Sequence, residues 1–251
     1  MTPGDRPSSS IARAYSDRVE VRGRDLAGDL MGSTTFTAYF HLLLTGSEPT
    51  EEQRYFLDLV LVALAEHGMM PTNVAARMTL AADPESLQGA VAAGILGCGP
   101  VILGTAGECA RLLEYAQASR HEAVEVARRF HDAGDRLPGF GHPVHKPVDP
   151  RAERILELAE AHGVAGSHVA LARDLRDAAA QVWRKPLTLN VSMAIAAVML
   201  DLAFPVAAVD AVPLLARTAG LLAHLAEERE HPSGLALAAA AEAAVDFRRA
   251  E

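Results

Sequence analysis

The sequence predicts an all-α protein, and composition is the first reason. Half of the 251 residues are hydrophobic, only 5% are aromatic, and alanine and leucine dominate the apolar set. This mixture favours helices, because strands prefer β-branched and aromatic side chains. The second reason is the placement of helix-breaking residues: segments of good helix formers are separated by short stretches that contain glycine or proline.

The predicted elements begin with an extended piece at 18–29, in which apolar and charged residues alternate around a turn at Gly23. Thr50 is the expected N-cap of a helix that runs to His67, and this helix is predicted to lie in the core because it is apolar on nearly all sides. Gly68 would end it. The predicted helices, more than ten, are 34–44, 53–67, 71–79, 87–96, 108–117, 121–132, 151–161, 167–183, 190–202, 212–228 and 235–249.

Charge and hydropathy exclude several classes of protein. The formal charge is -9 and the pI is near 5.6, which argues against a nucleic-acid-binding surface. The most apolar segment, 91–107, contains five glycines and a proline and is too short to span a bilayer comfortably. The start of the chain has no apolar core and does not read as a secretory signal. We therefore expect a soluble, cytoplasmic protein in which Cys98 and Cys109 are buried free thiols.

Residues 137–151 form a stretch that is rigid, polar and rich in charge. Two glycines and four prolines rule out a regular helix or a central strand there, and good helix formers flank it on both sides. It also holds two histidines, a lysine, an aspartate and an arginine. Such a loop suits an anionic small molecule, although composition alone also fits a surface connector.

A few polar residues stand out against apolar surroundings. His67 ends a predicted core helix, where a satisfied core histidine or a helix cap is the alternative to catalysis. Arg217 lies in an apolar helix, and because arginine is almost never buried unpaired it requires a structural carboxylate or an anionic ligand. His224 stays ambiguous. The histidines predicted to lie at the surface are His41, His121, His131, His162, His168 and His231.

The pattern Gly-Phe-Gly-His-x-Val-x-Lys-x-x-Asp-Pro-Arg at 139–151 resembles the signature of the citrate synthase superfamily. Further segments resemble family motifs in the family's order, within 18–232: 22–26 with 42–49, 66–77, 189–192 and 216–220. The short length and the Glu-His-Gly form at 66–68 are most similar to the citryl-CoA lyase branch, which includes the citrate-cleaving module of ATP-citrate lyase.

The resemblance implies a citrate synthase-like all-α homodimer in which a large and a small helical domain close over the substrates. We expect a disordered lead-in at 1–17, a large domain formed by 18–107 and 204–251, and a small domain at 108–203 that carries the loop 137–151. The implied substrates are a coenzyme A thioester and a small di- or tricarboxylic acid. No permanently bound cofactor, metal, nucleic acid or membrane is expected.

The resemblance also implies roles for individual residues. His142 would donate to the carbonyl or hydroxyl oxygen, and His67 would bind oxaloacetate. Arg151 and Arg217 would bind carboxylates, which the planar guanidinium grips bidentately. The further implied contacts are Asn190 and Arg229 for the acid, the backbone of Leu137, Pro138, Gly139, Phe140 and Gly141 for the CoA adenine, and Lys146 for its phosphates.

Two positions depart from the family pattern. Leu103 stands where citrate synthases carry a histidine that stabilises the enolate, a loss that lyase-type relatives also tolerate. Ser192 replaces the aspartate that carries the proton on the acetyl carbon, and a serine is no general base near neutral pH without activation. Loss of a positioned acid–base group typically costs about 10²- to 10⁴-fold in rate.

The expected function is that of a citryl-CoA lyase-like carbon–carbon lyase, which would release acetyl-CoA and oxaloacetate from citryl-CoA or cleave a related 3-hydroxyacyl-CoA. The enolate would then be protonated by water or by way of Ser192. The departures at Leu103 and Ser192 leave two alternatives. One is an enzyme diverged to another CoA thioester or to thioester hydrolysis, and the other is a CoA-binding pseudoenzyme.

Overall fold

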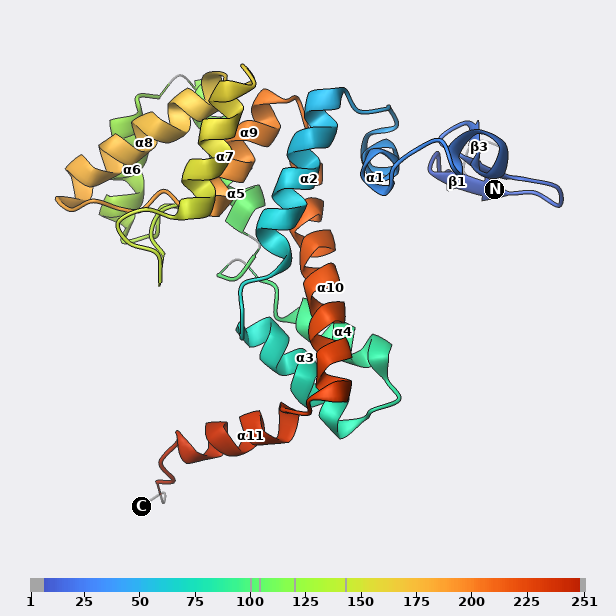
Figure 1. The fold of residues 1–251 in the computed structure, drawn as a ribbon. Helices are drawn as coiled ribbons and strands as arrows, with labels where there is room; N and C mark the ends of the chain where they lie inside the picture. The colour runs from blue at the N-terminus through green and yellow to red at the C-terminus, as the bar shows by residue number, and fades with distance from the viewer. Residues whose placement is uncertain (1–6, 100, 104, 120, 143, 249–251) are drawn as a thin grey trace. The chain divides into compact units, whose positions relative to one another are not determined.

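The structure is a computed structural model that describes residues 7–99, 101–103, 105–119, 121–142 and 144–248 (Figure 1). Across these residues it is helical with one small sheet, which confirms the all-α prediction. Contacts divide the chain into two compact units, Met1–Asp58 and Leu59–Glu251. The predicted division into a large and a small domain has a different boundary and stays a prediction.

The first unit contains a three-stranded antiparallel sheet of β1 (Ala12–Ala14), β2 (Val19–Val21) and β3 (Arg24–Asp25), in that order. A π-helix (η1, Leu26–Leu30) follows, and then α1 (Phe36–Thr45). The strand at 12–14 lies inside the lead-in that was predicted to be disordered. It is ordered by pairing with β2, where Ala12 faces Val21 and Ala14 faces Val19.

His41 corrects a prediction in this unit. It was expected at the surface, but its exposed fraction is 2% and its Nδ1 lies 2.9 Å from the carbonyl oxygen of Ser47. The partner of Nδ1 is thus local in sequence, and the adjacent Leu42 belongs to a small core with Val21 and Leu30. A buried histidine with a backbone partner needs no functional explanation.

Helix α2 (Glu51–Ala65) crosses from the first unit into the second. It begins with the predicted Thr50 cap: Gln53 N–H donates to Thr50 Oγ1 at 3.1 Å, and Thr50 N–H donates to Gln53 Oε1 at 2.9 Å, a reciprocal capping box. The expectation of a helix buried all round is wrong, because Phe56 is fully buried whereas Val62 is 79% exposed. The sequence is apolar on all sides, but packing partners cover only one face.

The second unit adds nine helices among the described residues. They are α3 (Pro71–Ala82), α4 (Leu87–Leu96), α5 (Thr105–Ser119), α6 (Ala123–Ala133), α7 (Pro150–Ala161), α8 (Ser167–Trp183), α9 (Val191–Asp201), α10 (Val206–Glu230) and α11 (Gly234–Ala243). Helices α3, α4, α10 and α11 pack together, and α9 packs against α5, α7 and α8 (Figure 1). Nearly all of α9 is buried, so it forms the centre of the second group.

Small residues allow close packing in the first group, as the sequence predicted. Ala76 on α3 and Ala90 on α4 are fully buried beside Leu221 of α10. A Cβ on Gly94 would lie 2.7 Å from the Leu221 side chain, which is too close for a real contact. The helix α10 therefore sits against α4 at a distance that only glycine permits.

Helix α10 is also long and apolar enough to cross a membrane by length and composition alone. Core helices of soluble proteins have the same length and composition, and 44% of the most apolar stretch of α10 is buried inside the protein. It also carries the buried Arg217.

Candidate functional site

The loop 137–142 is held against the residues that precede α9. Gly141 N–H donates to Thr188 O at 2.7 Å, and Asn190 N–H donates to Gly139 O at 3.0 Å. The side chain of Asn190 caps α9 through Ser192 N–H and donates to Gly141 O at 3.1 Å. The loop and the start of α9 therefore form one continuous hydrogen-bonded layer.

Gly139 is required where the loop crosses the core. Its φ is +83°, and a Cβ there would lie 2.7 Å from Met193 Cβ and 2.8 Å from Cys109 Sγ. Cys109 is fully buried, as predicted, whereas Cys98 is only partly buried, which corrects the prediction for that thiol. Burial raises the pKa of the Cys109 thiol well above its ordinary value, so it packs as an apolar group.

Asp149 anchors the far end of the loop. Its carboxylate is fully buried and accepts hydrogen bonds from Arg151 Nη2 at 2.9 Å, from Arg151 Nε at 3.1 Å and from Val191 N–H at 3.1 Å. Burial opposes its ionisation, but the bonds and charge of Arg151 and the backbone donor of Val191 outweigh burial and lower the pKa of Asp149. Arg151 is thereby fixed at the start of α7 and tied to α9.

The backbone determines which ring nitrogen of His142 carries the proton. Nδ1 accepts hydrogen bonds from Val144 N–H at 3.1 Å and from His145 N–H at 2.8 Å. The lone pair of Nδ1 is therefore occupied, and the neutral ring carries its proton on Nε2. Nε2 lies 3.4 Å from Arg151 Nη2, so two hydrogen-bond donors converge on one point, where an anionic or carbonyl oxygen would satisfy both.

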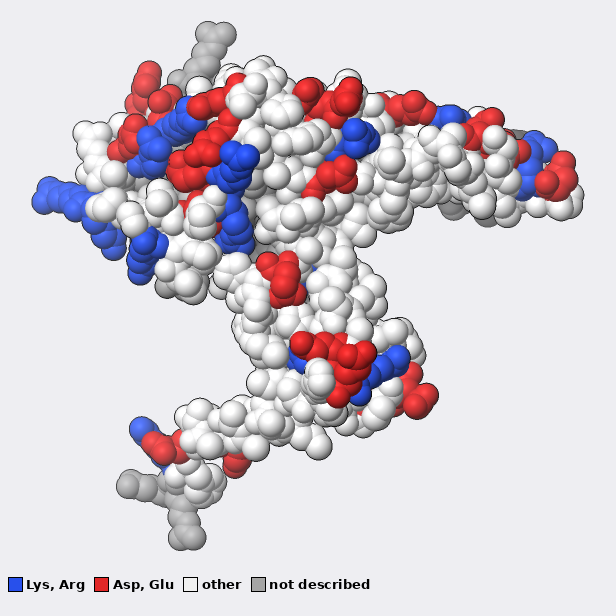
Figure 2. Space-filling view, in the orientation of Figure 1, with Lys and Arg blue, Asp and Glu red and all other residues white. Residues whose placement is uncertain are grey.

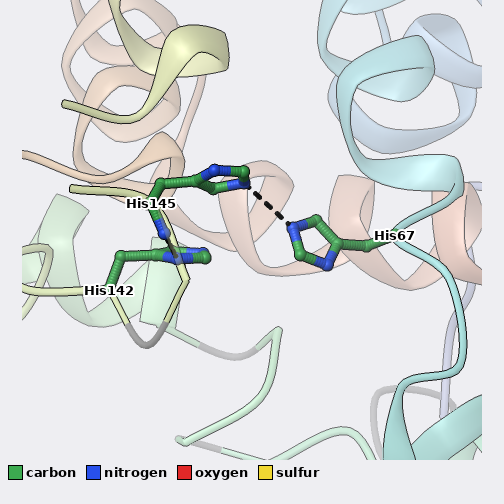
Figure 3. Close-up of side chains that lie close together, drawn as sticks. All are labelled: His67, His142 and His145. Carbon is green, nitrogen blue, oxygen red and sulfur yellow. Dashed lines mark hydrogen bonds between the residues drawn. The ribbon is translucent and has the colours of Figure 1, made fainter.

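Three imidazoles meet at this point although they come from two segments (Figure 3). His67 follows α2, and its Nε2 lies 3.3 Å from Nε2 of His145 in the loop. The ring of His145 stacks on His142 with centroids 4.4 Å apart. Burial is the largest cause that lowers the pKa of His67 and His142; the charge of Arg151 and the neighbouring His145 lower both further, while Asp149 partly opposes the shift at His142. Both rings are therefore neutral at pH 7.

Arg217 of α10 has the character of a binding residue. It is 4% exposed, and its contact among the described residues is from Nη1 to Asn73 Oδ1 at 3.4 Å, while its Nε has no partner there. Its partner Asn73 bonds to Glu66, the residue before His67, and the charge of Arg217 is one of the causes that lower the pKa of His67. The sequence left two partners open for Arg217, a structural carboxylate or an anionic ligand. The described residues provide no carboxylate, which favours the ligand.

His224 belongs to a supporting network. Its Nε2 lies 2.9 Å from Glu66 Oε2 and 2.8 Å from Asn73 Nδ2, and Arg77 Nε donates to its Nδ1 at 3.0 Å. The network holds Asn73, the residue that contacts Arg217. The sequence left the role of His224 ambiguous. Because each ring nitrogen already has a protein partner, His224 serves to hold Asn73 in place.

The structure brings His67, His142, Arg151 and Arg217 together and places Asn190 in the layer behind them. Ser192 is the second residue of α9, and no described contact joins its side chain to the histidines. Arg229 is exposed near the end of α10 without a described contact to the cluster, and Lys146 is exposed in the loop. Leu137 and Gly139 are buried, Pro138 and Phe140 are half-buried, and Gly141 is exposed.

His145 is the residue that sequence reasoning missed. Its signal was the spacing His142-x-x-His145 in a loop too rigid to disperse the two rings. Leu103, at the position of a family histidine, has a left-handed backbone with φ +74°, a conformation that costs a leucine free energy.

The three histidines also have ligand atoms within 4.8 Å of one another, the spacing of a metal site. A metal needs a free lone pair on each ring. His142 does not offer one in its neutral form, because two backbone N–H groups occupy Nδ1 and the proton is on Nε2. The cluster is better suited to an oxygen ligand than to a metal ion.

A pocket of about 1100 Å³ opens beside the loop, between α5 and α6, and reaches Pro138. Figure 2 shows basic side chains that project around α6 and α8, although the chain as a whole is acidic. The arginines that line the pocket are Arg111, Arg128, Arg129 and Arg136. Arg111 pairs with Asp210 and Arg129 with the Tyr115 hydroxyl, while Arg128 and Arg136 have no described ion pair.

Comparison with known proteins gives a consistent family. The family model described as citrate synthase, C-terminal domain, matches residues 9–235. A citryl-CoA lyase from Hydrogenobacter thermophilus superposes with a TM-score of 0.88 at 27% identity, over 97% of this chain and 95% of that one. An ATP citrate lyase from Methanothrix soehngenii, solved with citrate and coenzyme A, superposes with a TM-score of 0.80 at 20% identity, over 98% of this chain and 42% of that one.

A citrate synthase from Heyndrickxia coagulans is 30% identical over 205 residues, which cover 78% of this chain and 53% of that protein. The chain therefore spans about half the length of the curated relatives that it matches.

Proposed function

Because the chain belongs to the citrate synthase family, we propose that it is a citryl-CoA lyase-like enzyme that cleaves citryl-CoA, or a related 3-hydroxyacyl-CoA, to acetyl-CoA and oxaloacetate. The observation that carries the proposal is the convergence of His142 Nε2 and Arg151 Nη2, 3.4 Å apart, on the place for one oxygen. The likeness to a citryl-CoA lyase at a TM-score of 0.88 supports the lyase branch.

The site has the groups that the cleavage needs. When the carbon–carbon bond breaks, the hydroxyl of the citryl group becomes the carbonyl of oxaloacetate, and a donor must stabilise negative charge on that oxygen. His142 Nε2–H and Arg151 supply two donors that are fixed before the substrate arrives, which is the arrangement that stabilises such charge most effectively. Arg217, buried without a carboxylate partner among the described residues, would bind a carboxylate of the acid.

The coenzyme would enter along the loop. The exposed backbone at Gly141 and the half-buried Pro138 fit the adenine contact, and the arginine-lined pocket next to Pro138 would take the phosphates. Arg128 and Arg136 are better placed for that task than Lys146, because they line the pocket with no described ion pair to compete.

A second candidate is a diverged reaction of another CoA thioester, including hydrolysis, or CoA binding without turnover. Leu103 and Ser192 favour it, because each replaces a group that handles the enolate in citrate synthases. The protein would be a cytoplasmic homodimer in either case.

Citryl-CoA turnover by the purified protein tests the proposal directly. Oxaloacetate release should be measured alongside CoA-ester binding by calorimetry. Release well above the uncatalysed background supports the lyase. If the unmodified protein binds the CoA ester but releases no oxaloacetate, the remaining explanations are a pseudoenzyme or an enzyme for another acyl group.

The variant Ser192→Asp separates the two candidates. If the natural chemistry is the lyase reaction without an aspartate, Ser192→Asp is expected to leave the cleavage rate within about tenfold of the unmodified protein. A large gain of citryl-CoA cleavage, on the order of 10²-fold or more, would mean that the natural reaction does not use that pathway.

A further inference from the structure

The replacement of the family aspartate by Ser192 leaves a chemical problem that the imidazole cluster can solve. Cleavage removes a proton from the hydroxyl group and adds one to the enolate carbon. A serine hydroxyl neither accepts nor releases a proton readily near pH 7. If the chain cleaves a 3-hydroxyacyl-CoA as proposed, another group must move that proton.

His67 and His145 share one proton. Their Nε2 atoms are 3.3 Å apart, so one ring must donate and the other must accept.

The arrangement that leaves a base on the loop is donation from His145, and it is the one we infer. His145 donates its Nε2–H to the lone pair of His67 Nε2, and His67 then carries its own proton on Nδ1. Nδ1 of His145 is then left with a lone pair, and no described residue donates to it. In contrast, the lone pair of His142 is occupied by the backbone, so His142 can donate but cannot take up a proton. Of the three rings, His145 has the open basic nitrogen.

We propose that His145 is the acid–base residue of the cleavage, with His67 sharing its proton. The hydroxyl O–H bond breaks and its proton passes to Nδ1 of His145, while Nε2–H shifts toward His67. The carbon–carbon bond breaks, and its electron pair goes to the thioester enolate. The imidazole pair then returns one proton to the enolate carbon, which forms the methyl C–H bond and restores both neutral rings.

The surroundings suit this role. His145 stacks on His142 with an interplanar angle of 30°, which places it beside the oxygen that His142 and Arg151 would hold. The charges of Arg151 and Arg217 lower the pKa of His67, and that of Arg151 lowers the pKa of His142. The Asp149 carboxylate already accepts hydrogen bonds from Arg151 and Val191. Charge delocalised over two rings is easier to hold in a half-buried site than charge on one.

The test compares His145→Phe, which keeps a flat ring for stacking but has no nitrogen, with His231→Phe, the same change at an exposed histidine. His145→Phe is expected to lower kcat for citryl-CoA by about 10²- to 10⁴-fold while KM stays within a few-fold. It should also abolish the exchange of acetyl-CoA methyl protons with D₂O in the presence of oxaloacetate. In His145→Gly, added imidazole should restore part of the rate. Retention of kcat by His145→Phe within about threefold would overturn the proposal.

A second measurement remains informative if the unmodified protein cleaves no citryl-CoA, in which case the proposed function fails. Nitrogen-15 chemical shifts of the imidazoles report the tautomers without turnover. His67 is expected to show a protonated Nδ1 that changes its shift when His145→Phe removes the partner. Unchanged shifts for His67 would overturn the shared-proton pair itself.

Discussion

At the scale of single residues, Arg217 illustrates how an incomplete set of partners identifies a binding group. A buried guanidinium that serves the fold normally satisfies its five N–H donors with carboxylates and carbonyls. Arg77 in the same unit does so, with Glu227, Glu228 and His224 around it. Arg217 instead has a buried Nε without a partner among the described residues, a free-energy cost that an anionic ligand would remove.

We therefore expect Arg217→Met to separate binding from stability. Binding of the dicarboxylic acid should weaken by about 10²-fold or more, because a charged bidentate contact is lost. The melting temperature should stay the same or rise, since a buried cation without a protein partner is replaced by an apolar chain of similar length. Calorimetric titration with oxaloacetate and thermal unfolding measure the two effects, with Arg154→Met at an exposed position as the control. A large loss of stability with unchanged binding would assign Arg217 to the fold.

Much of the site at this scale could be predicted from the sequence, since the residues that converge lie in motifs or break an apolar pattern. His145 was missed: its spacing from His142 hints that the two rings lie together, but nothing in one sequence says that the ring would reach His67, which is 78 positions away. The burial of His41 was also hidden, because it depends on a carbonyl six residues further along, which is presented by a turn.

At the scale of elements, the layer of loop 137–142 and α9 contains two glycines that are needed for different reasons. Gly139 and Gly141 both have positive φ, but a Cβ at Gly139 would meet Met193 and Cys109, whereas a Cβ at Gly141 would meet nothing within 4 Å. The pair therefore separates backbone strain from steric overlap within one loop.

Gly139→Ala is expected to lower the free energy of unfolding by about 2–5 kcal/mol, the sum of the left-handed strain and the overpacking of α9. Gly141→Ala is the matched control and should cost only the strain, about 1–2 kcal/mol. Urea unfolding of both variants measures the difference. Equal losses in the two variants would mean that α9 moves aside and that the contact at Gly139 carries no energy.

Helix bounds at this scale were predicted best where both ends have strong signals. Residues 87–96 and 167–183 match α4 and α8 at both ends, whereas α10 begins six residues before its prediction, because Pro213 lies inside the helix instead of near its start. The π-helix at 26–30 and the strand at 12–14 depend on pairing that the local pattern does not encode.

At the scale of the whole molecule, buried carboxylates set the response to acid. Burial opposes the ionisation of Glu228, but hydrogen bonds from the Ser233 hydroxyl, from Gly234 and Ser233 N–H and from Arg77 outweigh it and lower the pKa to about 2. Between its ordinary pKa of 4.5 and 2, the unfolded chain binds more protons than the folded one, so stability is present above pH 4.5 and is lost as the pH falls toward 2. The lowered pKa values of His67 and His142 act in the same direction, beginning below pH 6.5.

Glu228→Gln is expected to lower the free energy of unfolding at pH 7 by about 3 kcal/mol, because it removes the buried one of the two carboxylates that pair with Arg77. The variant should also show a smaller dependence of stability on pH between 4.5 and 2. Denaturant unfolding across this range measures both effects, with Glu114→Gln at an exposed position as the control. If the pH dependence of the free energy of unfolding is the same in Glu228→Gln as in the unmodified protein, other groups cause the acid sensitivity.

The contact between His67 and His145 has one more consequence. His67 lies in the predicted large domain and His145 in the predicted small one, so the 3.3 Å contact would join the two predicted domains. If the domains swing apart, the bond breaks and His67 loses a neighbour that lowers its pKa. Opening would then be accompanied by proton uptake at His67, so a higher pH would favour the closed form.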